Sequence, residues 1–150
     1  MTIFSKYSDS QESIGFVFWQ THMLWNREIK KVLTPLRLTH TQFVILSVIN
    51  YLNESMEEVS QVDISELSKI DVMTISTSLK TLLKNDYIVR ERSTNDSRAY
   101  ILSLSSKGSD VLGKAMIIVE KVDSEFFKKT DISSKELLTI FKDLSSDDHA

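Results

Sequence analysis

The 150-residue sequence contains no cysteine, one proline and three glycines. Without cysteine it can form no disulfide, no thiolate metal site and no thiol-based oxidation sensor. Three glycines are too few for a glycine-rich phosphate loop, and no serine stands in a Gly-x-Ser-x-Gly pattern. The three histidines (His22, His40 and His149) lack the spacing of metal ligands on a helix. We therefore expect no enzyme activity, no metal and no cofactor.

Long hydrophobic runs are also absent. No apolar stretch reaches the roughly 18 residues that a membrane-spanning helix needs, and the N-terminus has neither the basic start nor the cleavage site of a signal peptide. Hydrophobic residues make up 41% of the chain and charged residues 26%, which is typical of globular domains. These features predict one cytoplasmic domain without a membrane contact.

The chain does contain helices with apolar stripes. The first is expected from Glu12 to Leu33, because Thr34 precedes a proline and such residues avoid the helical conformation. Its stripe comprises Ile14, Phe18, His22, Trp25, Ile29 and Val32. Further apolar residues lie off the stripe, namely Phe16, Val17, Trp19, Met23 and Leu24. A helix that is apolar on more than one face needs more cover than one small domain gives, so we interpret the excess as a subunit interface.

Three capping patterns mark the starts of the next helices. Thr39–Gln42 has the sequence of a capping box, and Ser60 and Asp71 are good N-cap residues. The short helix after Ser60 is expected to carry Ile64, Leu67 and Ile70 as its apolar residues. Residues 59–61 could add a small strand before it. Two short helices joined by a tight turn indicate a helix-turn-helix, whose second helix is the recognition helix in DNA-binding proteins.

The segment after Asp71 predicts that recognition helix and a hairpin. Ile75, Leu79, Leu82 and Leu83 follow helical spacing and should face the core, which leaves small hydroxyl side chains and lysines outside. Strands are expected at Tyr87–Arg92 and Ala99–Leu104, on either side of a polar tip. A long helix begins near Gly108, and a last helix spans Ile132 to Leu144. The fold class is thus mainly α (α+β).

Charge is unevenly distributed along the chain, whose formal net charge is −3. Between Lys69 and Lys107 there are seven basic and four acidic residues, a local charge of +3. The remainder has 11 basic and 17 acidic residues, or −6. Nucleic acid responds to the local field, so the positive segment favours a DNA contact, although a chance fluctuation is the alternative explanation.

In this order, the motifs resemble those of the MarR family of bacterial transcriptional regulators. The resemblance rests on Leu38–Leu46, Gln61 with Ile64 and Leu67, Asp71–Ser76, Leu79 with Leu82, Arg90, the wing Asp96-Ser97-Arg98-Ala99, and Leu104 with Gly108. It implies a winged helix-turn-helix over residues 37–108 and dimerisation helices over 12–36 and 109–145. It also implies a homodimer that binds a near-palindromic double-stranded DNA operator, usually as a repressor, and that responds to a small apolar or phenolic effector.

The candidate DNA-contacting residues are Met73, Thr74, Ser76, Thr77, Lys80, Lys84, Arg90, Asp96 and Arg98. The hydroxyl residues are expected at base edges or phosphates, the lysines at phosphates, and Arg98 in the minor groove. Asp96 could fix the conformation of the wing or serve only as a turn residue. The plain alternative for the others is a solvated surface.

Two departures from the family pattern are visible. Asp86 stands where glycine usually ends the recognition helix, so Asn85 or Asp86 must adopt a left-handed conformation. Thr77 stands where arginine or glutamine is common, which removes a bidentate base contact.

Two questions stay open at this point. His22 and Trp25 could line an effector pocket, but core and interface packing is the favoured interpretation. A winged-helix module for protein–protein contact, without DNA binding, is the competing function.

Overall fold

The computed structural model describes residues 4–96 and 99–146. In this part of the chain, six α-helices, two short 3-10 helices and a two-stranded antiparallel sheet follow one another. The elements are η1 (Ser10–Glu12), α1 (Ile14–Leu33), η2 (Thr34–Leu36), α2 (His40–Asn53), α3 (Gln61–Ser68), α4 (Val72–Lys84), β1 (Ile88–Arg92), β2 (Tyr100–Leu104), α5 (Ser106–Phe127) and α6 (Ser134–Ser145). The predicted fold class is confirmed.

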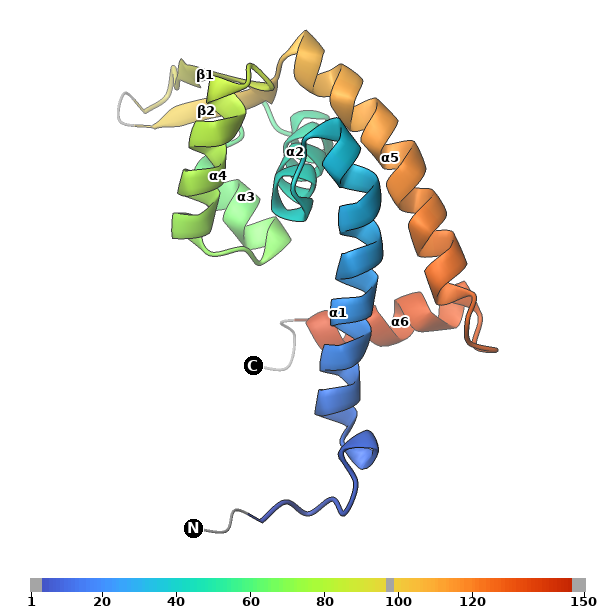
Figure 1. Ribbon diagram of the computed structural model, residues 1–150. Coiled ribbons are helices and arrows are strands. Elements are labelled where there is room, and N and C mark those ends of the chain that lie inside the picture. The colour runs from blue at the N-terminus through green and yellow to red at the C-terminus, as the bar shows by residue number, and fades with distance from the viewer. Residues whose placement is uncertain (1–3, 97–98, 147–150) are drawn as a thin grey trace.

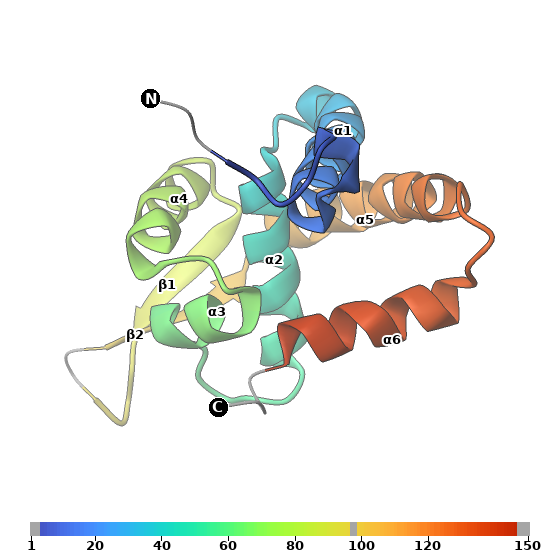
Figure 2. The same ribbon diagram turned by 90° about the horizontal axis from the view of Figure 1, so that it is seen from below.

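The elements form two groups around α2 (Figure 1). α1 and α5 lie side by side on one side of α2, and α3, α4 and the hairpin of β1 and β2 lie on the other. The view from below shows α6 leaving the end of α5 and running apart from α1 (Figure 2). We call the hairpin of β1 and β2 the wing. The helix-turn-helix, formed by α3 and α4, thus lies on the same side of the molecule as the wing.

Side-chain caps begin the helices as the sequence predicts. The Thr39 hydroxyl accepts a hydrogen bond from the Gln42 amide at 3.1 Å, and the Gln42 side chain accepts one from the Thr39 amide at 3.0 Å. Ser60 caps α3 in a second capping box, and an Asp71 carboxylate oxygen accepts from the Thr74 amide at 2.9 Å. These caps satisfy amides that a helix leaves without internal partners, so each fixes where its helix begins.

The predicted start of the first helix is wrong by two residues. Glu12 belongs to η1, and α1 begins at Ile14 because the Ser13 hydroxyl accepts from the Phe16 amide at 3.2 Å. Its predicted stripe is buried only toward the C-terminal end. Ile29 is fully buried, whereas Ile14, at the start of α1, is 83% exposed.

Two predictions around α3 are also corrected. Residues 59–61 form no strand in the described structure, since Gln61 already begins α3. The Val59 carbonyl nevertheless accepts a hydrogen bond from the Leu102 amide of β2 at 2.9 Å. Ile70 lies beyond the helix, which ends at Ser68 because Lys69 is left-handed with φ 65°.

The junction between α4 and β1 uses a left-handed residue, as predicted. Asp86 has φ 61°, while Asn85 keeps a negative φ of −86°. The backbone amide of Asp86 then donates to the Leu83 carbonyl at 3.1 Å, and the Tyr87 amide donates to Leu82 at 3.0 Å. The chain therefore turns directly from the recognition helix into the wing.

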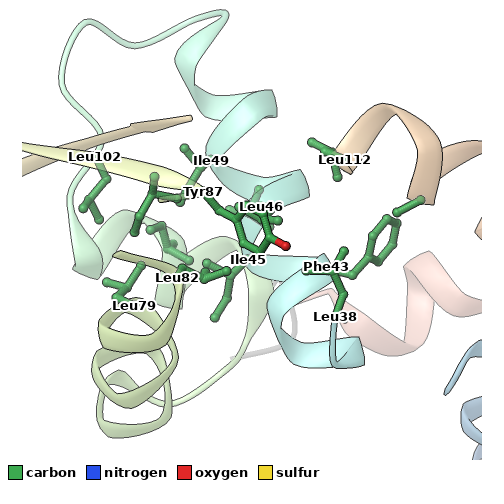
Figure 3. Close-up of a cluster of buried hydrophobic side chains, with 14 of the residues drawn as sticks. Leu38, Phe43, Ile45, Leu46, Ile49, Leu79, Leu82, Tyr87, Leu102 and Leu112 are labelled. Carbon is green, nitrogen blue, oxygen red and sulfur yellow. The ribbon is translucent and has the colours of Figure 1, made fainter. Parts of the chain in front are cut away.

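The core lies between α2, α4, the sheet and α5 (Figure 3). Its labelled side chains are Leu38, Phe43, Ile45, Leu46, Ile49, Leu79, Leu82, Tyr87, Leu102 and Leu112. Ile75, Leu79 and Leu82 of α4 are all buried, as their spacing predicts, and Leu83 is half-buried. Burial of one stripe fixes the rotation of α4 about its axis, so the opposite face must point to solvent.

The beginning of α5 packs closely on Tyr87, the residue that precedes β1. Gly108 is buried, and a Cβ placed there would lie 1.9 Å from the Tyr87 carbonyl oxygen. The same oxygen accepts a hydrogen bond from the Ser105 amide at 3.0 Å. Only glycine allows the α5 backbone to come this close to Tyr87. This explains why a glycine stands at residue 108, near the predicted start of the helix.

Within residues 4–96 and 99–146, no single helix has the length and apolar character needed to cross a bilayer. The stretches Ile14–Leu36 and His40–Asn53 reach those criteria only together, as a pair bent by 79°.

Candidate nucleic-acid interface

The solvent face of α4 carries most of the predicted DNA-contacting residues. Met73 is 78% exposed. Thr74, Thr77, Lys80 and Lys84 are exposed as well. None of these side chains is needed to complete the described core. Val72 and Thr81 are exposed too, so the outward face of α4 combines apolar, hydroxyl and cationic side chains.

The hydroxyls of Thr74 and Thr77 donate their protons to acceptors three and four residues earlier in the chain. Thr74 Oγ1 donates to Asp71 Oδ1 at 2.6 Å, and Thr77 Oγ1 donates to the Met73 carbonyl at 3.1 Å. The Thr74 hydroxyl and amide hold the pKa of Asp71 below its ordinary value, because both stabilise the carboxylate. With their protons engaged, the threonines offer a DNA groove their methyl groups and oxygen lone pairs. A methyl group suits contact with the methyl of thymine.

A groove separates α4 from the wing. Its lining includes Ser76, Lys80, Arg90 and Tyr100, with apolar side chains such as Leu79 and Leu102 below them. Ser76 is half-buried in this groove. It therefore lies on the flank of α4 that faces the wing, beside the two cations, and it is less open to solvent than Thr74 and Thr77.

Two arginines of the wing lie over one aromatic ring. The guanidinium carbons of Arg90 and Arg92 are 4.4 and 5.5 Å from the centre of the Tyr100 ring. Arg92 is paired with Tyr100 across the sheet. Such cation–π contacts hold the charges on the wing surface without neutralising them. The role of Tyr100 was missed from the sequence, because it depends on strand register.

Lys107 has a structural contact that the sequence did not reveal. Its Nζ donates to the Asn85 carbonyl at the end of α4 at 3.0 Å and lies 5.2 Å from the centre of the Tyr87 ring. A cation at a helix C-terminus is stabilising because the helix dipole is negative there. Lys107 therefore ties α5 to the end of the recognition helix while its side chain stays exposed.

The wing tip is only partly described. Asp96 is exposed, and its backbone carbonyl accepts a hydrogen bond from the Ala99 amide at 3.0 Å. Arg98, predicted to enter the minor groove, lies outside the described residues, as does Ser97.

A polar and aromatic junction joins α1, α2 and α5. Trp25 Nε1 donates to Asp123 Oδ1 at 2.8 Å. The Trp25 and His40 rings pack edge to face, with their centres 4.9 Å apart. His40 Nδ1 lies 2.6 Å from Asn26 Oδ1, and His22 Nε2 lies 2.8 Å from Asn26 Nδ2. The pKa of His40 is lowered, mainly because the ring is removed from solvent. The nearby charge of Asp123 raises this pKa, and His22 lowers it further. These contacts support the packing interpretation of Trp25 over the effector-pocket interpretation.

Comparison with known proteins agrees with this geometry. The family model described as transcriptional regulator SarA/Rot matches residues 27–115. The HTH-type transcriptional regulator YdcH of Bacillus subtilis (strain 168), itself uncharacterised, is 37% identical over 123 residues, which cover 82% of this chain and 84% of that protein. The relatives are transcriptional regulators rather than enzymes.

Solved structures share the fold at lower identity. Bordetella bronchiseptica BpsR, whose DNA binding is regulated by 6-hydroxynicotinic acid, has a TM-score of 0.80 at 18% identity, covering 97% of this chain and 99% of that chain. A mutant MarR from E. coli, complexed with operator DNA, has a TM-score of 0.75 at 20% identity, covering 87% and 90%. The predicted resemblance is thereby confirmed, and the chain belongs to the SarA/Rot family of transcriptional regulators, with the winged-helix fold of MarR proteins.

Proposed function

We propose that this regulator binds double-stranded operator DNA by placing α4 in the major groove and the wing beside it. The observation that carries the proposal is the outward face of α4, where Thr74, Thr77, Lys80 and Lys84 are exposed. Lys80 also lines one groove together with Arg90 of the wing. Threonine methyls and Met73 contact base edges. The lysines and Arg90 contact phosphates, and Arg98 enters the minor groove.

The DNA-binding form in this proposal is a homodimer. None of the residues of α6, all of which the structure describes, is buried within the chain. Its Leu138 and Leu144 are 53% and 76% exposed, and Phe18 and Trp19 of α1 are 62% and 58% exposed. An apolar surface of this extent is typical of a subunit interface. Residues 12–36 and 109–145 thus serve dimerisation, and residues 37–108 serve DNA binding.

A homodimer explains how a short recognition helix achieves specificity. Two-fold symmetry sets two α4 helices about one duplex turn, roughly 34–36 Å, apart on a near-palindromic site. Bound there, the dimer acts as a repressor in the cytoplasm. A small apolar or phenolic effector weakens binding, by analogy with the regulation of BpsR by 6-hydroxynicotinic acid.

The test is titration of purified protein into labelled duplexes from the promoter beside its own gene, at several salt concentrations. We expect a protected near-palindrome and affinity that falls steeply with salt, because neutralised phosphates release counterions. Light scattering on the same sample should give a dimer.

The competing function, a protein–protein module, predicts a different result. Binding to this duplex would then be absent, or no stronger than to a scrambled duplex at any salt concentration. A monomer that still protects one half-site would contradict only the dimer.

A further inference from the structure

Three consecutive residues before α3 contact three different parts of the DNA-binding region. Glu58 contacts the start of the wing loop, and Val59 accepts a hydrogen bond from the β2 amide of Leu102 at 2.9 Å. Ser60 caps α3, the first helix of the helix-turn-helix. Val59 is also buried, at 1% exposure. The segment 58–60 therefore connects the wing to the helix that supports α4.

The contact of Glu58 with the wing is made by both carboxylate oxygens. Ser93 Oγ donates to Oε2 at 2.7 Å. The Thr94 amide and hydroxyl both donate to Oε1, each at 3.2 Å. Glu58 is half-buried, and Ser93 is the one buried polar side chain among the described residues, at 8% exposure. These two wing residues follow β1 directly, at the point where the chain leaves the sheet.

The Ser93 hydroxyl requires an acceptor at the position of Glu58. Its oxygen already accepts from the amides of Asn95 and Asp96, each at 3.1 Å, so both lone pairs are occupied and only its proton remains. The Thr94 amide likewise can only donate. Ser93 and Thr94 use different oxygens of Glu58, and glutamine would replace one of these oxygens with a donor nitrogen. In either orientation, that nitrogen would face a donor.

We propose that Glu58 is a positioning residue that sets the wing relative to α4. Its carboxylate orders residues 93–96 of the wing. Segment 58–60 also fixes α3, which supports α4, through Ser60. The distance between α4 and the wing is thereby held constant. The inference rests on the proposed DNA binding, which it deepens. It assigns an acidic residue, which DNA should repel, a favourable effect on DNA affinity.

The carboxylate is ionised throughout the physiological range. The hydrogen bonds from Ser93 and Thr94 hold the pKa of Glu58 below its ordinary value of 4.5, with Ser93 the larger effect. The lowered pKa means that the anchoring is present above about pH 4.5 and is lost only as the pH falls through the lower folded value. Glu58 is thus a permanent anchor under these conditions.

Glu58→Gln and Glu57→Gln form a matched pair for the test. Both remove one negative charge from adjacent positions, and Glu57 is exposed. If charge alone mattered, both variants would bind DNA slightly more tightly. We expect Glu57→Gln to equal or exceed the wild type. We expect Glu58→Gln to bind about tenfold more weakly at ~0.1 M salt and to lose about one unit of salt slope per wing.

Two further readouts separate wing positioning from general damage. In footprints, Glu58→Gln should lose protection at the flanks, under the wing, and keep it under α4. Without DNA, hydrogen exchange of the Asn95 and Asp96 amides should quicken while the core amides of α2 stay protected. Ser93→Ala should show the same pattern. The double variant of Glu58→Gln and Ser93→Ala should bind DNA no more weakly than either single variant.

Each remaining outcome would overturn the inference. Equal affinity of the two glutamine variants, uniform loss of protection, or unchanged exchange at Asn95 and Asp96 would each do so. If the wild type itself fails to bind the promoter, the proposed function fails, and the exchange experiment still decides whether Glu58 orders the wing.

Discussion

Two glycines in the same helix should respond in opposite ways to the same substitution. Gly108 and Gly113 both lie in α5, but their surroundings differ. A Cβ at Gly108 would lie 1.9 Å from the Tyr87 oxygen and 2.8 Å from its carbonyl carbon. A Cβ at Gly113 would meet nothing within 4 Å. The pair therefore separates the intrinsic preference of a helix for alanine from the effect of a close backbone approach.

The magnitudes follow from three terms. Alanine is favoured over glycine inside a helix by about 1 kcal/mol, and this alone acts on Gly113→Ala. For Gly108→Ala the backbone of Tyr87 must move by roughly 1 Å to reach a normal contact, and such overpacking costs about 1–3 kcal/mol. The shift also strains the hydrogen bond from the Ser105 amide to Tyr87, worth about 1 kcal/mol. We expect a net loss of about 2–3 kcal/mol at Gly108, at the upper end of the overpacking range.

Thermal unfolding followed by circular dichroism measures both variants. At about 2–4 °C per kcal/mol for a chain of this size, Gly113→Ala should melt about 2–4 °C above the wild type and Gly108→Ala about 4–12 °C below it. Equal shifts, or a Gly108→Ala variant as stable as the wild type, would refute the argument that the contact with Tyr87 requires glycine.

Three further substitutions test the proposed DNA contacts and the junction of α1, α2 and α5. Thr77→Ala should cost ~1–3 kcal/mol of operator binding if its methyl contacts a base, whereas an equal loss on scrambled DNA would show that it only positions the helix. Arg98→Ala should lower the salt slope of operator binding by ~0.9 for each phosphate that the arginine neutralises, and an unchanged titration would remove this residue from the interface. His40, whose pKa is lowered from 6.5, contributes stability that is full above about pH 6.5 and is lost as the pH falls through its folded pKa. His40→Gln should therefore flatten the fall in melting temperature between about pH 7 and 5, and a slope equal to that of the wild type would contradict this assignment.

Local features of the fold were predictable because their causes are local. The caps at Thr39, Ser60 and Asp71 each act on the amide three residues further on, so sequence spacing was enough to locate three helix starts. The buried stripe of α4 likewise follows from a 3.6-residue period. Once that stripe is known, the outward position of Thr74, Thr77 and the lysines follows by geometry.

Contacts between distant segments were not predictable in this way. The hydrogen bond from Ser93 to the Glu58 carboxylate joins residues 35 apart, and the one from Lys107 to the Asn85 carbonyl joins residues 22 apart. Neither pair has a periodic pattern, because each depends on how two turns meet after the core has formed. The place of Tyr100 under two arginines required the register of β1 against β2, which the irregular alternation of the strands did not define.

The formal charge of a segment does not show where its charged side chains lie. The segment from Lys69 to Lys107 carries a formal charge of +3, but Lys107 is directed toward the end of α4. Lys80 and Arg90, in contrast, line the same groove between α4 and the wing. The positive electrostatic field at this groove therefore comes from a few cations, while the rest of the chain carries a formal charge of −6. Non-specific affinity should then be weak, and binding should depend on the correct spacing of α4 and the wing, which is the property that Glu58 controls in our proposal.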